Sequence, residues 1–134
     1  MDFEGFVDLL LEGRDDLFEL LRDARDERDV IVALASVVGC GMEVRFRLRF
    51  FDLVVDLLCG DLAVEVEFNR LPHEGVHQVL AYRIFLGFDS ALIHVLDYCT
   101  DDYVSSFKEL LKELNHLSIR GAIIDIASGE IIVV

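Results

Sequence analysis

Three strand-like segments follow one another between residues 43 and 68, and they restrict the folds open to this chain. Residues 43–50 (EVRFRLRF) alternate strictly between apolar and charged side chains, the period-2 pattern of a strand with one covered face. The segments 51–58 (FDLVVDLL) and 61–68 (DLAVEVEF) follow, joined by a short Cys59-Gly60 connection. The sequence therefore predicts a three-stranded antiparallel meander.

Helical patterns surround this meander. Apolar residues recur at spacings of three and four over 2–12 and 15–38, with Gly13 dividing them and a further break near Asp29 left open. Beyond the meander we expect a helix over 73–87, a buried strand over 90–98, a helix over 101–117 capped by Asp101 or Asp102, and a hairpin turning at Ser128-Gly129. This order predicts an α/β domain in which helices flank a mixed sheet.

The chain has 134 residues, enough for one domain with a sizeable core. Hydrophobic residues make up 54% of it and there is one proline, so a disordered protein is not expected. We divide this single domain into an acidic helical extension (1–22), a core (23–98) and a C-terminal helix with a hairpin (99–134).

Location and redox state are predicted from the chain's start and its cysteines. The first residues are acidic, unlike a signal peptide, and the longest uncharged run (30–42) is too short to cross a bilayer. We therefore expect a cytoplasmic protein without a membrane partner. Cys40, Cys59 and Cys99 form no C-x-x-C pair, and we expect reduced, buried thiols rather than a disulfide or a zinc site.

Charge is distributed unevenly along the chain. The net charge of −14 argues against a polyanionic partner, but residues 1–29 hold 11 acids and 4 arginines, a net of −7. The segment 43–50 is locally basic, and Arg45, Arg47 and Arg49 share one strand face. A row of guanidinium groups suits DNA phosphates. The alternative is a polar strand face that pairs with the acidic N-terminal helices.

Two neighbouring strands carry carboxylates on one face each. Glu65 and Glu67 share a face of 61–68, and Asp52 and Asp56 share a face of 51–58. If the apolar faces of the two strands coincide, the acids must lie together. Oxygen ligands favour Mg²⁺ or Mn²⁺, which would support phosphodiester hydrolysis. The alternative is the solvated face of a half-exposed sheet.

The stretch FDLVVDLLCGDLAVEVEF resembles the core signature of the PD-(D/E)XK nuclease superfamily, with an aspartate on the second strand and E-x-K on the third. The resemblance spans about residues 23–98. It implies a restriction-endonuclease-like fold in which Asp52 and Glu65 bind metal. We expect Asp56 to be a surface or supporting acid rather than a ligand. The resemblance also implies an outer ligand on the first core helix, at Glu27, although Asp23 and Asp26 compete for that place.

Gln78 and Tyr82 lie four residues apart, on one face of the helix predicted after the third strand. This spacing resembles the Q-x-x-x-Y motif of the RecB-like branch, whose members cut or process DNA ends. The resemblance implies that both residues position water or the DNA strand; an ordinary polar helix edge is the alternative. The four histidines lack metal-ligand spacing, and His94 is expected to be a hydrogen-bonded core residue.

Glu67 departs from the family pattern, because it stands where the superfamily has lysine. It would act as a general base or as a further metal ligand, with Arg70 or Arg83 as a migrated cation and Arg70 as a further DNA contact. The resemblance thus implies a magnesium-dependent deoxyribonuclease with an E-x-E variant motif. The alternative is a catalytically inactive nuclease-fold protein that serves as a binding or assembly subunit, in a homodimer or with another protein. An acidic mimic of nucleic acid would instead need rows of exposed carboxylates.

Overall fold

The meander predicted from residues 43–68 forms half of a six-stranded mixed sheet in the computed structural model, which describes residues 1–134. The strands lie in chain order: β1 (Gly41–Arg47), β2 (Asp52–Cys59), β3 (Leu62–Phe68), β4 (Asp89–Leu96), β5 (Ile119–Asp125) and β6 (Glu130–Val133). β1, β2 and β3 pair antiparallel, β4 and β5 run parallel to β3, and β6 returns antiparallel. The predicted α/β class with a mixed sheet is confirmed.

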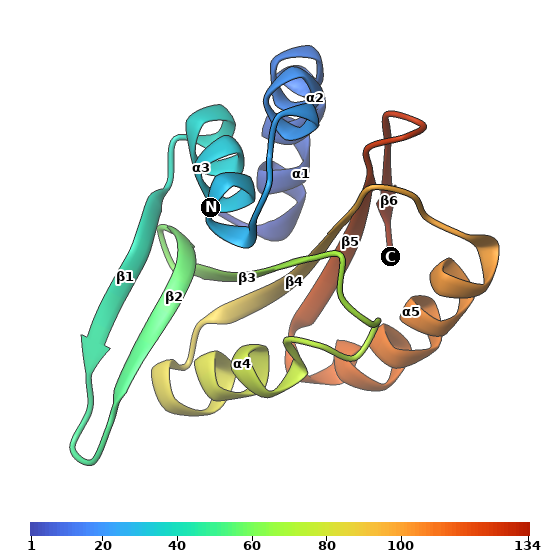
Figure 1. Ribbon diagram of the computed structural model, residues 1–134. Helices are drawn as coiled ribbons and strands as arrows, with labels where there is room; N and C mark the ends of the chain where they lie inside the picture. The colour runs from blue at the N-terminus through green and yellow to red at the C-terminus, as the bar shows by residue number, and fades with distance from the viewer.

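Helices cover both faces of the sheet (Figure 1). On one face lie α1 (Phe3–Glu12), α2 (Arg14–Arg22) and α3 (Glu27–Val38); on the other lie α4 (Val76–Ala81), the π-helix η1 (Tyr82–Leu86) and α5 (Asp101–Leu114), which ends in the 3₁₀ turn η2 (Asn115–Leu117). Two hydrophobic cores of 22 and 11 buried residues fill the two interfaces. None of the helices is long and apolar enough to span a bilayer.

Helix ends differ from the sequence expectations where side chains cap the backbone. The helical pattern over 15–38 is interrupted at residues 23–26, because Asp26 caps α3 by accepting a hydrogen bond from the Asp29 amide at 2.8 Å. α5 is capped by Thr100, which accepts from the Tyr103 amide at 3.1 Å, and not by Asp101 or Asp102. The two acids occupy the first turn instead, where the helix dipole favours them.

β2 leaves the sheet part of the way along its length. Pairing between β2 and β3 covers only Leu57–Cys59 and stops at the Leu57–Val64 pair, whereas β1 pairs with β2 from Gly41–Leu58 to Arg47–Asp52. Leu57 packs in the larger core and Val55, on the same side of the strand, packs in the smaller one, as a strong twist requires. Figure 1 shows β1 and β2 swinging away from β3 as a two-stranded ribbon.

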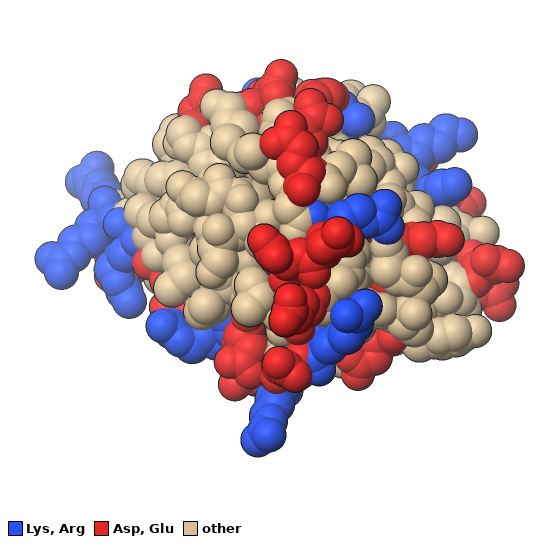
Figure 2. Space-filling view, turned by 90° about the horizontal axis from the view of Figure 1, so that it is seen from above, with Lys and Arg blue, Asp and Glu red and all other residues tan.

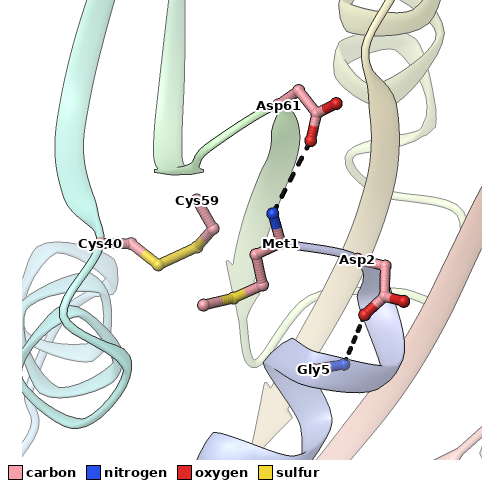
Figure 3. A network of polar contacts seen from close by, with 6 residues as sticks. All are labelled: Met1, Asp2, Gly5, Cys40, Cys59 and Asp61. Atoms are coloured by element: carbon pink, nitrogen blue, oxygen red, sulfur yellow. Dashed lines mark hydrogen bonds and ion pairs between the residues drawn. A yellow bond between two sulfur atoms is a disulfide. The ribbon is translucent and has the colours of Figure 1, made fainter.

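Cys40 and Cys59 form a disulfide, so the prediction of three reduced cysteines was wrong. The register of the ribbon explains the pairing: Gly41 lies opposite Leu58, which places the next residues, Cys40 and Cys59, opposite each other with Cα atoms 4.9 Å apart. Figure 3 shows this bridge beside Met1, whose backbone nitrogen lies 3.8 Å from Asp61 Oδ1. Disulfides are unusual in the reducing cytosol, so the cytoplasmic location stays a prediction.

Thiol titration of the unreduced, denatured protein is expected to find one reactive group per chain, that of Cys99. The bridge closes a loop over a sequence separation of 19, and its loss in Cys59→Ser should lower the free energy of unfolding by about 3 kcal/mol. Urea unfolding with and without reductant measures this loss, and Cys99→Ser is the control. Three reactive thiols before reduction would refute the bridge.

Candidate carboxylate site

The point where β2 and β3 separate, here called the fork, is where the acids of both strands meet. Asp56 and Glu65 are the first residues past the last β2–β3 pair. Asp56 Oδ2 accepts the Val66 amide hydrogen at 2.8 Å, so a side chain takes over the hydrogen bond that the sheet ladder no longer supplies. The parity of the strands therefore brings Asp56 against Glu65 and close to Glu67.

Tyr82, the first residue of η1, bridges the two arms of the fork. Its hydroxyl lies 2.6 Å from Glu65 Oε2 and 3.0 Å from the Val54 carbonyl oxygen. A tyrosine has one hydroxyl hydrogen, so it cannot donate to both acceptors at once. A protonated Glu65 resolves the conflict, because it donates to Tyr82 while Tyr82 donates to Val54. The geometry thus favours a neutral Glu65 in the absence of a cation.

Burial and mutual repulsion raise the pKa of all three acids. Loss of solvation, followed by the charge of Asp56, raises the pKa of Glu65 to about 10; this side chain is 6% exposed. Burial and then the charge of Glu27 raise the pKa of Glu67 to about 7. Burial also raises the pKa of Asp56, against the hydrogen bond from Val66, which lowers it. These acids are therefore poised to hold protons or to receive a cation.

Glu67 is held between a helix start and a tight loop. Glu27, at the first position of α3, lies close enough to Glu67 for its charge to raise the pKa of Glu67. On the other side is Gly75, whose positive φ of 90° suits glycine and whose added Cβ would lie 2.9 Å from Glu67 Oε1. The close approach of this loop accounts for the glycine before α4.

The remaining predicted residues lie apart from the fork. Asp52 is exposed at the start of β2 and pairs with Arg45 at 3.1 Å, so it does not join Glu65. Gln78 is exposed on α4, without a side-chain hydrogen bond. Arg83 donates to the carbonyl oxygens of Leu117 and Gly87, away from the acids. Arg47, Arg49 and Arg70 are exposed.

His94 is a neighbour of the site that forms part of its frame. It lies opposite Glu67 in the β3–β4 register and is fully buried, and burial lowers its pKa to about 4. Its Nε2 is 2.9 Å from the Glu74 carbonyl oxygen and its Nδ1 is 2.8 Å from the Tyr103 hydroxyl. The expectation of a hydrogen-bonded core histidine is confirmed, and His94 ties the loop before α4 to α5.

No lysine or arginine compensates the acids of the fork, because the four ion pairs of the molecule involve other carboxylates. No group of three or more His, Cys, Asp or Glu side chains is arranged to hold a metal ion. Mg²⁺, however, is commonly bound by one or two carboxylates, with water and substrate phosphate completing its shell. The adjacent Asp56 and Glu65 fit that donor set, and a cation would relieve their repulsion.

Two of these features escaped the sequence analysis. Asp56 was assigned to the surface because parity alone does not say which aspartate of β2 lies opposite Glu65. Gly75 was not considered, and its position before a helix, after Pro72 and His73, was the only pattern that pointed to a tight turn. Comparison with known proteins adds no relative: no protein-family model, curated protein or solved structure matches this chain.

Proposed function

We propose that this chain is a Mg²⁺- or Mn²⁺-dependent nuclease that hydrolyses phosphodiester bonds in DNA, built on a restriction-endonuclease-like core. The observation that carries the proposal is the Asp56–Glu65 pair: a half-buried and a buried carboxylate side by side, without a basic partner, at the fork of β2 and β3. Buried like charges are costly unless a proton or a cation neutralises them. A divalent ion is the neutralising partner that also supports hydrolysis.

Each residue of the fork has a distinct role in this proposal. Asp56 and Glu65 hold the cation, so Asp56 takes the place that the resemblance implied for Asp52. Tyr82 orients Glu65 through the 2.6 Å contact between its hydroxyl and Oε2. When bound, the ion supplies polarisation of a phosphoryl oxygen and a lower pKa for a bound water. Glu27 lies behind Glu67 as an outer acid.

Glu67 is proposed as the general base in place of the superfamily's lysine. It is partly exposed, unlike Glu65, so it can reach a water molecule at the fork. A carboxylate cannot supply the positive charge that lysine brings to the developing phosphate charge. It can accept a proton from the attacking water, which is worth 10²- to 10⁴-fold in rate for a well-placed base.

Glu67→Gln is expected to lower the rate of Mn²⁺-dependent cleavage by roughly 10²-fold or more, because glutamine cannot accept the proton. Initial rates on labelled single-stranded, duplex and branched DNA measure the loss. Glu113→Gln, which changes an exposed glutamate on α5, is the matched control and should cleave at the wild-type rate. If Glu67→Gln cleaves DNA as fast as the control, Glu67 is not the general base.

A catalytically inactive nuclease-fold protein is the second candidate, and two observations favour it. No basic side chain stands in for the missing lysine, since Arg83 is engaged elsewhere. None of the five main surface hollows is lined by Asp56, Glu65 or Glu67. Such a protein would act as a binding or assembly subunit. If the pure wild type cuts neither single-stranded, duplex nor branched DNA with Mg²⁺ or Mn²⁺, the catalytically inactive protein is the better description.

A further inference from the structure

The tip of the β1–β2 ribbon is the basic part of an acidic molecule. Residues 44–51 contain three arginines and no acid, on a chain of net charge −14. β1 is the edge strand of the sheet and carries the exposed Arg45 and Arg47, and the exposed Arg49 lies in the turn that follows it. Arg45 pairs with Asp52, which leaves Arg47 and Arg49 without an acidic partner. Figure 2 shows basic side chains gathered on the left, where Figure 1 places this ribbon.

Exposed aromatic rings adjoin these arginines. Phe50 is 85% exposed, Phe85 54% and Phe51 41%, in a molecule that otherwise buries most of its phenylalanines. The rings of Phe51 and Phe85 meet edge to face with centroids 4.9 Å apart, which joins the ribbon to η1. The Arg49 guanidinium carbon lies 5.2 Å from the Phe50 ring centroid. Together these side chains form an exposed surface of aromatic faces and free positive charge, here called the Arg–Phe surface.

The Arg–Phe surface is directly connected to the fork. Phe85 belongs to η1, the π-helix that begins with Tyr82. Tyr82 is buried and contacts Glu65, while Phe85, three residues on, faces solvent. A π-helix is rare and is found mostly at functional sites. Here it presents one aromatic residue to the carboxylates and another to the outside.

We infer that the Arg–Phe surface binds single-stranded DNA, with bases stacking on Phe50 and Phe85 and phosphates contacting Arg47 and Arg49. Aromatic platforms beside positive charge are how proteins bind single strands without sequence preference. Only unpaired bases offer their faces for stacking, so a duplex should bind less well. The inference names the substrate class of the proposed nuclease and rests on that function for its role, but binding itself does not require cleavage.

The test is fluorescence anisotropy with a labelled oligothymidylate of about 20 nucleotides, in the presence of chelator so that nothing is cleaved. Phe50→Ala and Phe85→Ala should each weaken binding about tenfold, since each removes one stacked base. Arg47→Ala should lower the slope of log affinity against log salt by about 0.7. The duplex of the same length should bind at least about tenfold more weakly, through loss of stacking.

Two controls separate this inference from the alternatives. Leu20→Ala removes an exposed apolar side chain on α2, on the opposite layer, and should leave the affinity unchanged. Glu113→Gln changes an exposed glutamate on α5 and should also keep the affinity. DNA binding without any cleavage in the wild type would contradict the proposed nuclease but not this inference. Wild-type affinity in the double variant Phe50→Ala/Phe85→Ala would overturn it. A second result would also overturn the inference. Sedimentation velocity would show that the wild type is a dimer, and Phe50→Ala and Phe85→Ala would dissociate it without altering the DNA affinity.

Discussion

Asp56→Asn is expected to abolish metal-dependent DNA cleavage, with a loss on the order of 10³-fold or more, because a catalytic cation contributes several kcal/mol to the transition state. Asparagine keeps the volume of the side chain. Its carbonyl oxygen can still accept the Val66 amide hydrogen, which Asp56 accepts at 2.8 Å. The fork should therefore keep its shape while losing one negative ligand. Initial cleavage rates at saturating Mn²⁺ measure the effect.

Asp52→Asn is the matched control for this prediction. Asp52 is on the same strand but exposed, and its partner is Arg45 at 3.1 Å. An exposed ion pair of this kind contributes at most about 1 kcal/mol to stability. The Asp52→Asn enzyme should therefore cleave at close to the wild-type rate. Equal losses in the two variants, or a larger loss in Asp52→Asn, would assign the metal to the residue first predicted from the sequence.

Glu65→Gln is expected to raise the free energy of unfolding of the metal-free protein at pH 8. The increase should be several kcal/mol, the order of magnitude that the pKa shift implies. Burial and the charge of Asp56 raise the folded-state pKa of Glu65 to about 10, far above its ordinary value of 4.5. A raised pKa means that the folded state holds the proton more tightly. The stabilisation that this proton gives to the folded state is complete below pH 4.5 and is lost as the pH rises towards 10. Glutamine, always neutral, can still donate to Tyr82.

The measurement is urea unfolding with chelator at a series of pH values between 5 and 8. Over this window the wild type should lose stability by up to about 1.4 kcal/mol per pH unit from Glu65 alone. Glu65→Gln should have a flatter profile and a higher free energy of unfolding at pH 8, while Glu113→Gln on α5 should follow the wild type. Parallel profiles for Glu65→Gln and the wild type would show that Glu65 is not held protonated.

The sheet was predictable because its strands carry strong local patterns. The strict alternation of 43–50 and the continuous apolar run of 90–98 identify strands without tertiary information. The structure has strands at both places, β1 and β4, which end earlier than predicted, at Arg47 and Leu96. Element ends were less predictable, since a cap depends on which side chain reaches the free amides. Thr100, and not the following aspartates, caps α5 for that reason.

The candidate site was predictable in composition but not in register. Side-chain parity required the acids of β2 and β3 to share a face, and Asp56, Glu65 and Glu67 do. Parity is identical for Asp52 and Asp56, so it cannot choose between them. The choice follows from where pairing stops, at Leu57–Val64, and that depends on the twist of the ribbon. The same missing register hid the Cys40–Cys59 bridge.

The most direct test of the carboxylate site is calorimetric titration of Mn²⁺ into the purified, chelator-stripped protein. We expect one site per chain in the wild type and in Asp52→Asn, with proton release as Glu65 ionises, since binding must displace the proton that the geometry assigns to it. Asp56→Asn and Glu65→Gln should each lose the site. Absence of Mn²⁺ binding in the wild type, or binding that survives both changes at the fork, would contradict the proposed metal site.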